Sequence, residues 1–200
     1  MNKRFSLPLI IAVLALGLFV FATPKRFFNF PQSSREAPAG PVNEALAAQF
    51  DYLSKNGNSS CSATFKDSIA SMPDAERLRG SCCGPMYLHT YAEQIEGLKK
   101  YAHIPEIPPD PYNVEAGLAK KLLAAYDLEL TPEQQQAYDY AMEHSDENGP
   151  CCCKCWRWYA YGGLGKILIT QYGFTGKQAT DIWNLSEGCG GEEHKGGHHT

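Results

Sequence analysis

The feature that most constrains this chain is a crowded run of cysteines in its C-terminal half. Of its 200 residues, eight are cysteines, and four of these stand within five positions, at Cys151, Cys152, Cys153 and Cys155. Adjacent cysteines do not readily form a disulfide with each other, because the bond needs a specific separation and direction of the two side chains. The four thiols must therefore reach several different partners, and the fold has to bring those partners to one place.

The N-terminus carries a targeting signal. Lys3 and Arg4 precede an apolar run from Leu7 to Ala22. This run is shorter than the ~20 residues of a membrane-spanning helix and longer than the ~7–15 residues of a signal-peptide core. We therefore predict a signal-anchor or a cleaved signal peptide over residues 1–26. Either outcome exports the rest of the chain, as an anchored or a secreted protein, to a compartment where disulfides persist.

Composition divides the rest of the chain into three parts. A Pro- and Ser-rich linker covers 27–42, a Cys-rich helical domain covers 43–188, and a Gly- and His-rich tail covers 189–200. Within the domain, apolar residues recur at helical spacing, and no stretch shows convincing β alternation. We therefore predict an all-α fold, a compact bundle of about six or seven short helices preceded by the N-terminal hydrophobic segment.

Local signals predict where several helices begin. Pro85 is expected to open one helix, and another is expected from Trp156 to Tyr172. Thr131 and Thr175 are each followed by a glutamine three positions later, which predicts a capping box at both positions. The glycines of YGGLGK, at 161–166, lie inside a helical pattern and are expected to allow close helix packing rather than to bind a phosphate.

Two cysteine clusters are therefore predicted to lie at helix N-termini. One is the pair before Pro85, and the other is the run before Trp156. Unpaired N–H groups and the positive end of the helix dipole favour the thiolate, which is the form that binds metals and attacks disulfides. If the two helix starts meet, up to six sulfurs converge. The predicted metal ligands are these six cysteines and one histidine on the helix after the first cluster: Cys82, Cys83, Cys151, Cys152, Cys153, Cys155 and His89.

Bunched cysteines fit a sulfur-rich site for a soft or borderline metal such as copper, zinc or mercury. Copper and zinc are the leading candidates. An iron–sulfur cluster is the weaker alternative, because the ferredoxin spacings are absent. The leading hypothesis is a membrane-anchored, extracytoplasmic protein that sequesters or delivers a metal, or confers resistance to it. No motif of an enzyme accompanies the cysteines, so we do not predict an enzyme.

Two other functions remain open. An even number of cysteines in an exported chain is the usual mark of a disulfide framework, which would make this a stapled structural or interaction domain. Cys61 and Cys189 are the first candidates for such structural pairs. The third hypothesis is a thiol–disulfide oxidoreductase, because Cys152 and Cys155 match CxxC, although no βαβ pattern surrounds them.

Charge narrows the range of partners. The formal net charge is −4, and residues 1–26 hold four basic and no acidic residues, so the remainder carries −8. A negative domain is poorly suited to phosphate backbones, and nucleic acid is not predicted as a partner. The predicted partners are the membrane, through the N-terminal segment, a metal ion, and a membrane or periplasmic protein.

The stretch PCCCKC, at 150–155, resembles the P-C-x-C-x-C signature of the PCYCGC-motif proteins. These are exported bacterial proteins without an assigned activity. The match covers six residues and departs from the family at Cys152 and Lys154, where the family has Tyr and Gly. The resemblance implies export and a role centred on Cys151, Cys153 and Cys155, and it implies no particular reaction.

Overall fold

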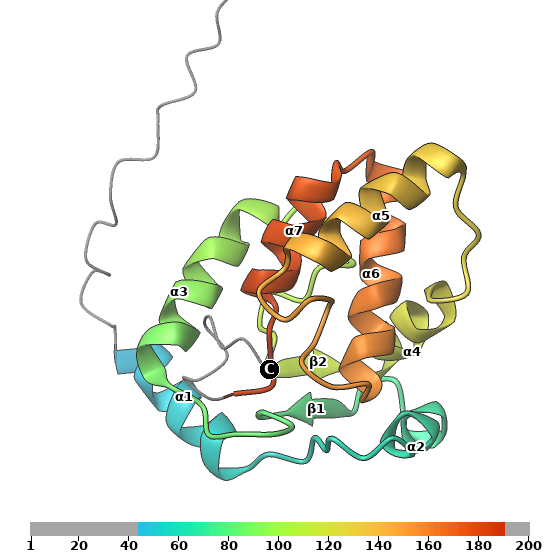
Figure 1. Cartoon of the computed structure of the whole chain (residues 1–200). Coiled ribbons are helices and arrows are strands. Elements are labelled where there is room, and N and C mark those ends of the chain that lie inside the picture. The colour runs from blue at the N-terminus through green and yellow to red at the C-terminus, as the bar shows by residue number, and fades with distance from the viewer. Residues whose placement is uncertain (1–43, 191–200) are drawn as a thin grey trace, which may run out of the picture. The chain divides into compact units, whose positions relative to one another are not determined.

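A computed structural model describes residues 44–190, which form a mainly helical domain (Figure 1). Its α-helices are α1 (Glu44–Lys55), α2 (Phe65–Ser71), α3 (Leu88–Leu98), α4 (Ala116–Ala125), α5 (Pro132–His144), α6 (Trp156–Tyr172) and α7 (Gly176–Leu185). A 3-10 turn, η1 (Lys99–Tyr101), extends α3, and two short strands, β1 (Arg77–Arg79) and β2 (Asn113–Glu115), complete the described part. The prediction of a mainly helical fold is thus confirmed for these residues.

The predicted N-terminal hydrophobic segment, the linker and most of the Gly- and His-rich tail lie outside the described residues. None of the helices described here has both the length and the apolar character needed to cross a membrane.

The predicted capping boxes are present in α5 and α7. The Thr131 hydroxyl accepts a hydrogen bond from the Gln134 backbone N–H at 3.3 Å, and the Gln134 side chain accepts one from the Thr131 N–H at 3.0 Å. Thr175 and Gln178 repeat this arrangement at the start of α7. In each case two backbone donors that a helix start leaves unpaired are satisfied locally, which is why the sequence located these boundaries well.

The helix expected from Pro85 begins later, at Leu88. The N–H groups of Cys83 and Gly84 both donate to the Cys189 carbonyl, at 3.0 and 2.7 Å. This pairing with the C-terminal segment holds the residues before the helix in a non-helical path, and Tyr87 remains extended at φ −118°, ψ 129°. A distant backbone partner therefore outweighs the local preference of proline for a first helical turn.

The all-α prediction is corrected by the two strands. β1 and β2 pair antiparallel, with Leu78 opposite Val114 and Arg77 opposite Glu115. Leu78 and Val114 are buried, and the Arg77 guanidinium donates to the Glu115 carboxylate at 2.7 Å. Strands of three residues are too short to display an alternating pattern, so their pairing depends on long-range contacts that periodicity does not reveal.

Helix α6 is the centre of the domain and packs against α4, α5 and α7 (Figure 1). It is apolar on most sides, and eleven of its seventeen residues are buried. The glycines of this helix were predicted to allow close helix packing. This is confirmed at Gly163, where a Cβ would lie 1.9 Å from the Leu122 carbonyl oxygen of α4. This close approach sets the position of α6, whose N-terminal end lies beside the small sheet.

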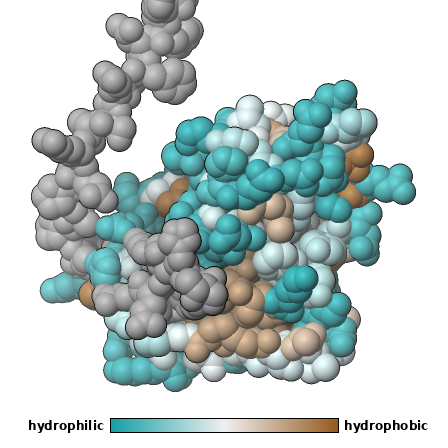
Figure 2. Space-filling view, in the orientation of Figure 1, coloured by the Kyte–Doolittle hydropathy of each residue, from teal (hydrophilic) through white to brown (hydrophobic). Residues whose placement is uncertain are grey.

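The segment that follows α7 returns to the same end of the domain, next to β1 and β2 (Figure 1). The face seen in Figure 2 is mostly hydrophilic, with a hydrophobic area toward this end. The cysteine-bearing segments gather here.

Replacing Gly163 with Ala is expected to lower the free energy of unfolding by at least about 3 kcal/mol, because the new methyl group meets rigid backbone rather than a movable side chain. Gly97→Ala is the matched control, since its methyl group would meet only the flexible end of Leu185. That change is expected to stay within about 1 kcal/mol of wild type. Urea denaturation measures both, and equal effects would contradict the proposed packing of α6.

Candidate metal centre

All eight cysteines converge on one region of the domain. They come from four segments: the loop after α1, the loop after β1, the run that precedes α6, and the segment after α7. Their sulfur atoms form four overlapping groups, each with all members within 4.8 Å of one another: Cys61, Cys82 and Cys83; Cys82, Cys151 and Cys189; Cys151, Cys153 and Cys155; and Cys83, Cys152, Cys153 and Cys189. The two predicted cysteine clusters therefore meet. The predicted position of both at helix N-termini is correct only for the second, because α3 begins at Leu88 and Cys82 and Cys83 lie in the loop before it.

Backbone pairing brings the C-terminal cysteine to this place. The Cys82 N–H donates to the Gly188 carbonyl at 3.3 Å, and the two following N–H groups donate to the carbonyl of Cys189. Gly190 has φ +74°, and a Cβ there would lie 2.5 Å from the Gly84 carbonyl oxygen. Glycine is required at this point both for the backbone conformation and for the close approach of the two segments.

The three buried cysteines, Cys151, Cys155 and Cys189, form an inner group with the half-buried Cys82. Cys151 and Cys155 are 1% exposed and Cys189 is 0% exposed. Cys82 Sγ lies 3.9 Å from the sulfurs of both Cys155 and Cys189, and Cys151 Sγ lies 3.8 Å from that of Cys155. A tetrahedral site with metal–sulfur bonds of about 2.3 Å has sulfur–sulfur edges of about 3.8 Å. These three distances match such an edge, and the distance from Cys151 Sγ to Cys189 Sγ is shorter, at 2.7 Å.

An outer group of Cys83, Cys152 and Cys153 lies against the inner one and shares Cys189 with it. Cys83 is exposed, and Cys152 and Cys153 are half-buried. Cys83 forms a disulfide with Cys61, while the other six cysteines are thiols. The Cys83 sulfur also lies 3.6 Å from that of Cys153, so the disulfide is in contact with the thiols of the cluster.

A buried arginine lies beside the inner group. Arg157, in the first turn of α6, is 0% exposed. Its guanidinium donates to the Pro111 carbonyl at 2.6 Å and to the Gly80 carbonyl at 3.1 Å, and it stacks on the Trp156 ring at 4.7 Å. A Cβ on Gly188 would lie 2.2 Å from this guanidinium, so the chain next to Cys189 passes directly over the cation.

Both of these hydrogen bonds of the Arg157 guanidinium go to neutral carbonyl groups. A buried charge costs several kcal/mol unless hydrogen bonds and nearby negative charge offset it. Burial by itself lowers the pKa of Arg157, but the anionic forms of Tyr161, Cys82 and Cys189 raise it above its ordinary value. Negative charge on these groups therefore favours the charged form of Arg157.

The sulfurs of the inner group also shift one another's pKa values. Hydrogen bonds with Cys151, Cys155 and Cys189 lower the pKa of Cys82 well below its usual range, and the Arg157 charge lowers it further. The pKa of Cys151 is raised, first by its hydrogen bonds with Cys152 and Cys155. Among the inner sulfurs, the pKa of Cys82 is thus lowered, whereas the pKa values of Cys151, Cys155 and Cys189 are raised.

For Cys153, in the outer group, burial is the main cause of the pKa shift. Burial, together with the nearby charge of Cys155, raises the pKa of Cys153 to about 12. Cys153 therefore stays protonated near neutral pH unless a cation is bound to its sulfur.

The six predicted cysteine ligands are brought together, and two residues outside that prediction join them. Cys189, expected to begin the tail, is buried in the inner group, and Cys61 is bonded to Cys83. The glycines on both sides of Cys189 are the sequence signal for this close backbone approach. His89 is exposed on α3 with its Nε2 3.3 Å from the Thr90 hydroxyl, and it belongs to none of the ligand groups found among residues 44–190.

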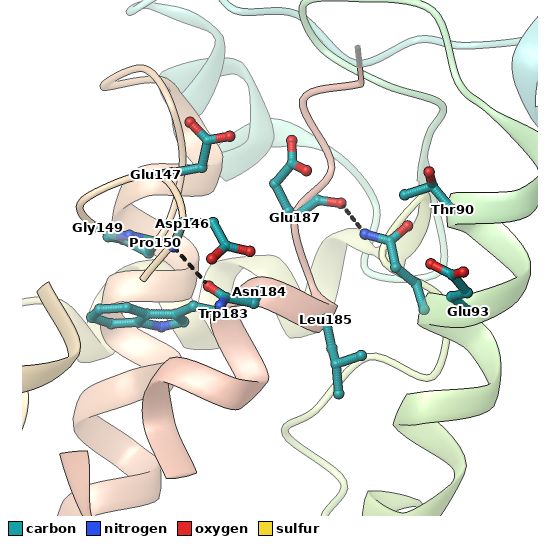
Figure 3. Close-up of a pocket in the computed structure, with 11 residues that line it drawn as sticks. Thr90, Glu93, Asp146, Glu147, Gly149, Pro150, Trp183, Asn184, Leu185 and Glu187 are labelled. Atoms are coloured by element: carbon teal, nitrogen blue, oxygen red, sulfur yellow. Dashed lines mark hydrogen bonds between the residues drawn. The ribbon is translucent and has the colours of Figure 1, made fainter. Parts of the chain in front are cut away.

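An acidic pocket of about 200 Å³ lies next to the cysteine-bearing segments (Figure 3). Its lining includes Glu93 on α3, Asp146 and Glu147 in the loop before the cysteine run, and Glu187 just before the last cysteine. Carboxylates concentrated in this way raise the local concentration of cations. The electrostatics on this side of the cluster thus favour approach of a positively charged ion.

Fold and site together define a mainly helical protein with a cysteine cluster that could hold a metal ion. No protein-family model matches the chain, and neither the curated proteins nor the solved structures include a significant match.

Arg157→Met is expected to lower the free energy of unfolding by roughly 2–4 kcal/mol, because it leaves two buried carbonyl groups without a donor. It is also expected to move thiolate formation to higher pH. The arginine lowers the pKa of Cys82, so its loss leaves less thiolate at any given pH. Urea denaturation and an ultraviolet thiolate titration of chelator-treated protein measure the two effects.

Lys154→Met is the matched control. Lys154 lies within the cysteine run but is exposed, so solvent screens its charge. Both measurements are expected to stay near wild type. A thiolate titration that is the same in wild type and Arg157→Met would contradict the electrostatic role of the arginine.

Proposed function

We propose that this protein binds a soft or borderline metal ion, Cu(I) or Zn²⁺ first among them, through the thiolates of its cysteine cluster. Its role is sequestration or delivery of the ion rather than catalytic turnover. The observation that carries this proposal is the convergence of eight cysteines from four separate segments, six of them thiols, around one partly buried point.

A disulfide framework accounts for this arrangement less well. A cross-link stabilises a fold mainly by restricting the unfolded chain, and this effect depends on closing loops rather than on gathering all the sulfurs at one point. The inner sulfurs lie mostly at the spacing of a metal–thiolate site, and a buried guanidinium offers the positive charge that such an anionic site needs. A purely structural core needs neither this sulfur spacing nor a buried charge.

The donor set favours a soft metal. Thiolates prefer Cu(I), Zn²⁺ and Hg²⁺ over hard cations, which are bound by oxygen ligands. The thiols of the cluster also range from the buried Cys151 to the half-buried Cys152 and Cys153. A partly exposed thiolate site allows an incoming or accepting thiol to reach the metal, which suits transfer to another protein.

We further propose that the domain works on the outer side of a cell membrane. The basic and apolar N-terminal segment supports this placement. A disulfide between Cys61 and Cys83 is also compatible with it, because disulfides persist outside the reducing cytosol.

Full-length protein extracted anaerobically from the membrane fraction, then loaded with Zn²⁺ or Cu(I), is expected to retain metal through dialysis against a moderate chelator. Cys155→Ser is expected to lose at least about tenfold in affinity, since an inner thiolate ligand is replaced by a neutral hydroxyl. Elemental analysis and chelator competition measure this change.

His89→Ala serves as the control and is expected to bind metal as wild type does, because His89 lies apart from the sulfur groups. Metal-free protein with all eight cysteines in disulfides would contradict the metal hypothesis and support the stapled domain. Recovery of the chain only from the soluble cytoplasm would contradict its proposed placement.

A further inference from the structure

The outer group has four sulfurs, but one of them is engaged in a disulfide. Cys83, Cys152, Cys153 and Cys189 lie within 4.8 Å of one another, which is close enough for a single ion to contact all four. Cys83 is bonded to Cys61. A disulfide sulfur carries no negative charge and is a poor metal ligand, whereas a thiolate is a strong one. In this state the outer group offers Cys152, Cys153 and Cys189, and it shares Cys189 with the four thiols of the inner group.

The position of the disulfide makes it accessible from both sides. Cys83 is exposed to solvent, so an external thiol can reach its sulfur. On the inner side, the same sulfur lies 3.6 Å from Cys153 Sγ and 3.8 Å from Cys82 Sγ. A Cys83 thiolate would therefore form directly among the other outer sulfurs, without any movement of the backbone.

We propose that the outer group is a second metal site, and that the Cys61–Cys83 disulfide controls it. With the disulfide formed, only the inner group binds a metal ion tightly. Reduction releases Cys83 as the fourth outer ligand, and Cys189, which belongs to groups on both sides, bridges the two ions. This inference rests on the proposed function, because it assigns a second site within the same metal-binding cluster.

The chemical step is a thiol–disulfide exchange with a dithiol donor. A donor thiolate attacks the exposed Cys83 sulfur, a mixed disulfide forms, and Cys61 leaves as a thiolate that takes up a proton. The second donor thiolate then attacks the donor sulfur of the mixed disulfide, and Cys83 leaves as a thiolate. The donor ends as a disulfide, both cysteines end reduced, and the Cys83 thiolate is the form that binds the metal.

Cys61 is not expected to replace Cys83 in the outer site. Its sulfur groups only with Cys82 and Cys83, away from Cys152 and Cys153. Because only Cys83 can join the outer site, substituting either cysteine of the disulfide has a different expected effect. Cys61→Ser leaves Cys83 permanently available, whereas Cys83→Ser removes the fourth outer ligand in every redox state.

The test is zinc stoichiometry before and after reduction. The full chain is purified anaerobically, loaded with Zn²⁺, and dialysed against a moderate chelator. A parallel sample is first treated with a phosphine reductant, which is oxidised to its oxide and adds no thiol ligand. Reduction is expected to raise the zinc content of wild type about twofold. Cys61→Ser is expected to hold the higher content with or without reductant, and Cys83→Ser the lower content in both.

Each other outcome decides between the two proposals. Equal zinc content in oxidised and reduced wild type, with the inner site loaded, would overturn the second site and leave the proposed function standing. No retained zinc in either state would overturn both. Circular dichroism, together with zinc retained by the inner site, shows whether each variant is folded. A Cys83→Ser variant that is folded yet still gains zinc on reduction would also overturn the assignment.

Discussion

The arrangement of this domain depends on one buried cation. The Arg157 guanidinium binds the carbonyl groups of Gly80 and Pro111 and lies under Gly188. It thereby ties together the loop before the first cysteine pair, the loop before β2, and the segment before Cys189. A buried charge is costly, and the groups whose negative charge would offset it include Tyr161, Cys82 and Cys189. The same residue that organises the backbone around the cluster therefore also favours negative charge within it.

The packing of α6 explains why this cation and the cysteine run lie where they do. Gly163 allows α6 to approach the backbone of α4 closely, and the helix is covered on most of its sides by α4, α5 and α7. Its N-terminal end is consequently buried, and Arg157 there contacts the backbone next to both strands. Metal–thiolate sites need ligands held at defined spacing, and a central, fully packed helix provides such a support.

Much of the fold followed from local patterns, whereas the site depended on long-range contacts. The bounds of α6 and the caps at Thr131 and Thr175 are local properties, and they were predicted well. The two strands, the late start of α3 and the inclusion of Cys189 all depend on pairing between segments far apart in the chain. The role of Arg157 was also missed, because a single arginine among aromatic residues reveals its burial only when its neighbours in space are known.

The central claim is that cysteine sulfurs alone surround a bound metal ion, and X-ray absorption spectroscopy of the zinc-loaded protein tests it most directly. We expect four sulfur atoms around the zinc ion at about 2.3 Å, with no nitrogen contribution. A shell dominated by nitrogen or oxygen, at about 2.0–2.1 Å, would contradict it, because the ion would then be held by histidine, carboxylate or water instead of by the cluster.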